Sequence, residues 1–231
     1  MRIMPIDTNL NIVRDGLIAW YDVLFQTSYP DSGTTWYDLS GNDYNGTLVN
    51  GVGYDSANGG TLTFDGSNDH IQLGTASKFL PSPSQTTIEV WLKPDVINVY
   101  RKIFTTMNSG SSAITGIYFS QGSSPYKLYF GLKTSTTQAI IVYNTDISTT
   151  NYSHIVCTYN NPTAKIYING ALVVSGSIGG TIGTGGIARI SGYDNGSEIF
   201  DGNIGSFRIY SKALSADEIT HNYNTTKGRF I

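Results

Sequence analysis

Short strand-like runs, separated by turn residues, recur along nearly the whole chain. In residues 87–92 three aliphatic side chains alternate with Glu89 and Trp91, so the two sets face opposite sides of a strand. Comparable runs occupy residues 17–23, 61–64, 70–73, 115–120, 127–132, 139–143, 154–159 and 164–168. Because no long helical pattern separates them, βαβ crossovers and a parallel sheet are excluded. The sequence therefore predicts an all-β protein with antiparallel sheets.

The dipeptide Asn169-Gly170 is the clearest hairpin signal. It separates two apolar runs, residues 165–168 and 171–174. Asn and Gly tolerate the two positive φ values of a type I′ turn, which connects antiparallel neighbours through two residues. We expect the flanking strands to pair directly.

The last third of the chain combines a turn, a strand and a helix start. Residues 200–210 predict a strand, and Ser215 and Glu218 form a capping-box pattern. We expect about two turns of helix, sealing the sandwich edge, before residues 222–226 disperse into a polar tail. The glycine-dense residues 176–186 predict a mobile loop. The expected organisation is an N-terminal arm or tail over 1–15, one two-sheet sandwich over 16–224 and a C-terminal tail over 225–231.

Composition narrows the function. Only 13% of the 231 residues are charged and the formal net charge is −3, so nothing favours binding to nucleic acid or to an anionic membrane. No run of about 18 apolar residues is present, and the N-terminus lacks an apolar run of secretory length, so we expect no export signal. The single cysteine, Cys157, cannot form an internal disulfide and lies in a strand-like run, which predicts a buried thiol.

The order and spacing of several segments resemble the concanavalin A-like lectin/glucanase superfamily, in its laminin-G-like jelly-roll branch. The segments are residues 16–22, 36–48, 62–71, 87–94, 165–170 and 200–219. Residues 32–60 and 223–230 are similar to versions found in tailed-phage structural proteins. The resemblance implies a two-sheet antiparallel jelly-roll sandwich with one short C-terminal helix. Because that superfamily includes lectins, hydrolases and scaffolds, the fold alone does not fix the function.

The resemblance, the missing export signal and the missing catalytic pair together favour a non-catalytic, lectin-like protein of a phage virion, present in many copies as a capsid decoration or a tail-associated adhesion module. Its expected partners are other virion proteins or cell-surface glycans. The alternatives are a secreted or surface carbohydrate-binding module of a bacterium and a glycoside hydrolase. Retaining hydrolases need two carboxylates roughly 5 Å apart, whereas residues 88–93 offer only Glu89. We interpret Glu89 as a solvent-facing strand residue.

Two kinds of binding residue are candidates. Tyrosines near loops and strand ends suit the apolar faces of sugars, with Asp and Asn to hold hydroxyl groups; these are Tyr100, Tyr118, Tyr126, Tyr143, Tyr193, Asp194 and Asn195. No cofactor is required by this chemistry, but the oxygen-rich turn at residues 65–69 suits calcium. The calcium candidates are Asp65, Asn68 and Asp69 in this turn, and Asp201; the residues of the turn also suit a plain hairpin connection.

Overall fold

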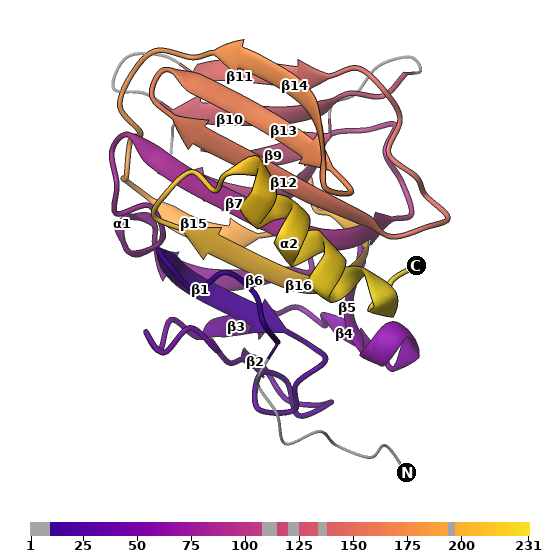
Figure 1. Ribbon diagram of the computed structural model, residues 1–231. Helices are drawn as coiled ribbons and strands as arrows, with labels where there is room; N and C mark the ends of the chain where they lie inside the picture. The colour runs from indigo at the N-terminus through magenta and orange to yellow at the C-terminus, as the bar shows by residue number, and fades with distance from the viewer. Residues whose placement is uncertain (1–9, 108–114, 120–124, 134–137, 194–196) are drawn as a thin grey trace.

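Two antiparallel sheets of eight strands each pack face to face in the computed structural model, which describes residues 10–107, 115–119, 125–133, 138–193 and 197–231 (Figure 1). Sheet A has the order β14-β13-β12-β7-β16-β5-β4, with β1 also paired to β16; sheet B has the order β11-β10-β9-β8-β15-β6-β3-β2. The predicted all-β sandwich is confirmed.

The strands are β1 (Leu17–Asp22), β2 (Thr35–Trp36), β3 (Gly46–Val49), β4 (Gly53–Asp55), β5 (Thr61–Asp65), β6 (His70–Thr75), β7 (Gln85–Pro94), β8 (Arg101–Met107), β9 (Thr115–Phe119), β10 (Leu128–Lys133), β11 (Gln138–Tyr143), β12 (Ser153–Asn160), β13 (Thr163–Ile168), β14 (Ala171–Ser177), β15 (Ile187–Ile190) and β16 (Asp201–Tyr210). The helices are η1 (Ala57–Gly59), α1 (Ala76–Phe79), α2 (Ala216–Thr226) and η2 (Lys227–Arg229).

The core lies between the sheets, where alternate residues of each strand meet. Ile88, Val90 and Leu92 of β7 are fully buried there, with Phe207 of β16 and Phe104 of β8. The period-two pattern read from the sequence therefore points its aliphatic side chains inward, as a sandwich core requires.

Strand β16 joins the two ends of the chain. It pairs with β7 on one side, and on the other with β5 at its start and β1 at its end. The hairpin between β13 and β14 is confirmed: Asn169 and Gly170 have φ values of 51° and 79°, and Ile168 is the register partner of Ala171.

Helix α2 begins as predicted but extends further and lies elsewhere. Ser215 and Glu218 form both hydrogen bonds of the capping box. The helix continues for 11 residues to Thr226, and it crosses the outer face of sheet A instead of sealing an edge (Figure 1). Asn222 and Thr226, polar residues that we predicted to begin a tail, are buried against that face because the sheet carries polar partners beneath them.

The two ends of the chain also differ from the expectation. Phe230, in the predicted tail, stacks on Trp91 with ring centroids 4.5 Å apart. Near the other end, Ile12 is buried against Trp20, and the Val13 N–H donates to the Asn222 side chain over 2.9 Å. Residues 10–15 and 225–230 thus pack on the domain; residues 1–9 lie outside the described part of the chain.

The glycine-dense segment is anchored by two buried isoleucines. Ile178 and Ile182 enter the core, and their N–H groups donate to the carbonyls of Pro162 and Pro83. The prediction of a mobile loop overlooked these two apolar anchors within the glycines.

Candidate functional site

Three of the predicted tyrosines gather around one lysine on the outer face of sheet B. Lys102 of β8 is the register partner of Tyr118 of β9. Both side chains point away from the core because their strand neighbours, Ile103 in β8 and Ile117 and Phe119 in β9, point into it. Tyr193 enters from the segment after β15. We call Tyr100, Lys102, Tyr118 and Tyr193 the tyrosine cluster.

The Lys102 ammonium lies over all three rings of the tyrosine cluster. Its Nζ is 3.8 Å from the ring centroid of Tyr118, 4.8 Å from that of Tyr193 and 5.4 Å from that of Tyr100. Its charge is paired with Glu198, whose Oε2 is 2.9 Å from Nζ. Burial lowers the pKa of Lys102, while Glu198 acts in the opposite direction. Burial also raises the pKa of Tyr193 to about 12, so the phenol stays protonated near neutral pH.

The tyrosine cluster presents one open aromatic ring. Tyr118 is buried, with Lys102 near its ring and Tyr129 stacked at 5.1 Å between centroids. Tyr100 is 44% exposed, and Tyr193 is partly exposed. Aromatic rings bind the apolar faces of sugars, and phenolic hydroxyls reach the sugar hydroxyls. The cluster therefore provides a stacking surface fixed from below by a buried cation.

The other predicted sugar-binding residues are placed differently. Tyr126 and Tyr143 pack partly buried against the core, and the Tyr126 N–H donates to Asp146. Asp194 and Asn195 lie outside the described residues. Lys102, which organises the cluster, was missed by the sequence reasoning. Its alternation with Ile103 could have placed it on an outer face, but nothing local indicates three converging rings.

The calcium candidates occupy the turn between β5 and β6 and the start of β16. Asp65 and Asp201 are register partners. The Asp65 carboxylate accepts from the Ser67 N–H, and the Asp69 carboxylate accepts from the Asp65 N–H, so both fix the turn itself. Burial raises the pKa of both Asp69 and Asp201. The described residues contain no group of three or more His, Cys, Asp or Glu side chains arranged to hold a metal.

Glu89 lies buried beneath α2, so our interpretation of a solvent-facing residue was wrong. Its carboxylate accepts from Arg208 at 2.7 Å and from Asn222 at 2.8 Å, and lies 2.9 Å from the His154 ring nitrogen. Burial alone would raise the pKa of Glu89, but Arg208 and then His154 and Asn222 hold it at about 2. Strand alternation correctly placed Glu89 on the outer face of sheet A, but helix α2 covers that part of the face.

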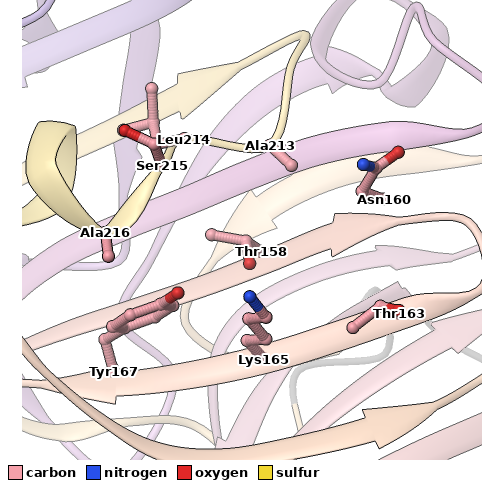
Figure 2. Close-up of a pocket in the computed structure, with 9 residues that line it drawn as sticks. All are labelled: Thr158, Asn160, Thr163, Lys165, Tyr167, Ala213, Leu214, Ser215 and Ala216. Carbon is pink, nitrogen blue, oxygen red and sulfur yellow. The ribbon is translucent and has the colours of Figure 1, made fainter.

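A polar groove lies on the outer face of sheet A, beside the start of α2 (Figure 2). Its volume is about 330 Å³. One side is formed by alternate residues of β12 and β13, and the other by residues 213–216. The strand side chains that line it are Thr158, Asn160, Thr163, Lys165 and Tyr167. Sequence reasoning missed this groove, because its walls come from segments about 50 residues apart.

The wall formed by residues 213–216 is fixed to sheet A. The Thr87 hydroxyl donates to the Lys212 carbonyl over 2.7 Å and accepts from the Leu214 N–H over 2.9 Å. Leu214 then packs on Tyr167 in an apolar cluster with Val156. The groove is therefore the part of the sheet face that remains open where the helix begins.

No helix among the described residues is long and apolar enough to cross a membrane.

Comparison with known proteins assigns the family. A family profile described as the concanavalin A-like lectin/glucanases superfamily matches residues 65–220, which is more than half of the chain. The chain belongs to this superfamily. The superfamily assignment agrees with the jelly-roll sandwich and gives the chain a lectin/glucanase-like, carbohydrate-binding fold. A search of curated proteins finds no match.

Solved structures share this fold at low sequence identity. Domain 4 of AbnA, an extracellular GH43 arabinanase of Geobacillus stearothermophilus solved with arabinotriose, aligns with a TM-score of 0.69 and 22% identity over 90% of this chain and 98% of that domain. The binding domain of Paraclostridial Mosquitocidal Protein 1 aligns with a TM-score of 0.71 and 20% identity over 92% of this chain. The binding domain of botulinum neurotoxin DC, solved with SialylT, aligns with a TM-score of 0.70 and 16% identity over 92% of this chain. The chain spans about half the length of the two toxin binding domains, with 52% of each covered.

Proposed function

We propose that this protein is a non-catalytic glycan-binding domain that holds its sugar against the tyrosine cluster. The exposed ring of Tyr100, fixed beside the buried Lys102, is the observation that carries the proposal. A sugar ring stacks on Tyr100, and the Tyr100 and Tyr193 hydroxyls bind its hydroxyl groups. The carbohydrate-binding fold of the superfamily and the sugar-bound AbnA domain support this reading.

The test is retention on polysaccharides by affinity electrophoresis. We expect the wild-type protein to be retarded by at least one member of a panel of arabinan, β-glucan, mannan and bacterial surface polysaccharide. Tyr100→Ala should abolish the retardation and Tyr100→Phe should keep most of it. Tyr37 is a matched control, because it is 45% exposed against 44% for Tyr100. Loss of binding in Tyr37→Ala, or unchanged binding in Tyr100→Ala, would contradict the proposal.

The absence of catalysis is supported by the position of Glu89. A glycosidase carboxylate must reach the scissile bond, but the Glu89 carboxylate is sequestered by Arg208 and Asn222 beneath α2. We expect no reducing-sugar release above background on the same polysaccharide panel. Release that disappears in Glu89→Gln would overturn this part of the proposal.

The placement of the domain on a phage particle is a finer proposal. It rests on the similarity of residues 32–60 and 223–230 to tailed-phage structural proteins, where many copies would add avidity to weak sugar contacts. The alternative, a secreted bacterial module, is favoured by the alignment to 98% of domain 4 of an extracellular arabinanase. Mass spectrometry of purified particles and of culture medium separates the two, because the protein should copurify with particles only in the first case.

A further inference from the structure

We infer that the polar groove beside α2 is a second binding site, specific for a saccharide that carries a carboxylate group. The groove lies on sheet A, whereas the tyrosine cluster lies on sheet B. Binding in the groove is therefore separate from sugar binding at the tyrosine cluster, and the two can be tested independently.

The polar side chains of the groove are free to bind a ligand. Thr158 and Tyr167 are largely buried residues, each 3% exposed, and both line the groove. A hydroxyl that faces a groove can donate one hydrogen bond to a ligand there and accept others from it. The Lys165 amine is directed toward Thr158, its register partner on β12 (Figure 2).

Lys165 gives the groove its charge preference. It is the only charged residue among the lining side chains, and it makes no ion pair or hydrogen bond through its side chain to another described residue. The first turn of α2 adds the positive end of the helix dipole, and it also carries Asp217 and Glu218. The Glu218 carboxylate is paired at 2.7 Å with Lys212, which also binds Asp15. A carboxylate in the groove would thus meet an ammonium that has no competing anion in its walls.

The remaining lining groups favour a sugar over a simple anion. The Asn160 amide and the hydroxyls of Thr158, Thr163 and Tyr167 offer both donors and acceptors. The Ser215 hydroxyl accepts from the Glu218 N–H, so its own proton remains available. A volume of about 330 Å³ accommodates a sugar unit. Several hydroxyl partners around one cation match a uronic-acid type of ring.

The test is an amide-resolved NMR titration of the full chain with methyl glucuronoside and methyl glucoside, which differ only by carboxylate against hydroxymethyl. The glucuronoside should shift amides of residues 156–167 and 213–216 saturably, at least about tenfold more tightly than the glucoside. Added sodium chloride should weaken the binding of the glucuronoside, because salt screens its attraction to Lys165. Equal affinity for the two probes would overturn the inference, as would equal affinity for acetate, which would show a simple anion site.

Two variants check the residues. Lys165→Met should weaken glucuronoside binding at least about tenfold, whereas Lys127→Met, at an exposed lysine outside the groove, should leave it unchanged. Tyr167→Phe removes one hydroxyl and keeps the packing, so it should weaken both probes; it also tests the site if Lys165→Met folds poorly. Unchanged binding in both groove variants would refute the assignment. Tyr100→Ala should leave glucuronoside binding intact, so failure of the tyrosine cluster proposal remains distinguishable.

Discussion

Replacing Glu89 by Gln would remove the negative charge from the buried network beneath α2. Arg208 would stay buried with Asp22 as its remaining carboxylate partner, at 3.5 Å. The bonds from His154 and Asn222 would meet a neutral amide in place of a carboxylate. The expected result is a large loss of stability with the fold retained, because the core on the other face of β7 is untouched.

Two estimates of the loss agree. Removing one member of a buried ion pair lowers the free energy of unfolding by about 3–5 kcal/mol. We expect the lower end of this range, because Arg208 keeps Asp22 as a carboxylate partner. Independently, the pKa of Glu89 lies at about 2 against an ordinary value of 4.5. Since one pKa unit corresponds to about 1.4 kcal/mol, ionisation of Glu89 contributes about 3 kcal/mol. We therefore expect Glu89→Gln to lower the free energy of unfolding by about 3 kcal/mol at pH 7.

The sign of the pH dependence follows from the lowered pKa of Glu89. Its contribution is fully present above pH 4.5 and is lost as the pH falls from 4.5 toward 2. Urea unfolding followed by tryptophan fluorescence at several pH values should show this loss in the wild type and a flatter profile in Glu89→Gln. Asp43→Asn, at an exposed carboxylate, is the control and should behave as the wild type.

A double-mutant cycle decides whether the charge pair is responsible. Arg208→Met alone should also destabilise, because it leaves the Glu89 carboxylate buried without its main partner. The double variant should recover about 2 kcal/mol relative to the sum of the two single losses. Additive losses, or a loss below about 1 kcal/mol in Glu89→Gln, would refute the reasoning.

Three further predictions concern packing and reactivity. Phe230→Ala should lower the free energy of unfolding, measured by urea unfolding, by about 3 kcal/mol, because a buried aromatic ring is removed. A loss below about 1 kcal/mol would show that packing of the C-terminal segment contributes little to stability. Gly170→Ala should destabilise more than Gly33→Ala by the same assay: both glycines have positive φ, but only at Gly170 would the new Cβ lie 3.0 Å from Tyr223. Cys157 is fully buried and its thiol pKa is raised well above its ordinary value, so iodoacetamide at pH 8 should label it only in urea; labelling of the folded protein at a similar rate would contradict this burial.

The local pattern was sufficient for most of the fold. Alternation in residues 87–92 gave the two faces of β7, Asn169-Gly170 gave the hairpin, and Ser215 with Glu218 gave the start of α2. Each of these signals is confined to a few neighbouring residues. Their physical causes, which are side-chain period, φ preference and capping, act over the same short range.

The sites depended on contacts that are distant in sequence. Tyr100 and Tyr193 were candidates from composition and position alone, but Lys102 joins them only because β8, β9 and the segment after β15 meet on one face. The polar groove likewise requires β12 and β13 to lie beside residues 213–216. No local sequence pattern predicts these contacts between distant segments.

The strands, their faces, the hairpin and the helix cap can all be predicted from the sequence, because they follow from interactions within a few residues. What covers each face of a strand depends on packing between segments that are distant in sequence. Glu89 reads as a solvent-facing strand residue until α2 is placed over it, and Asn222 reads as part of a polar tail until its amide meets that carboxylate. Burial is a property of the partner surface, so a polar residue changes from exposed to buried when a distant polar partner compensates its loss of water.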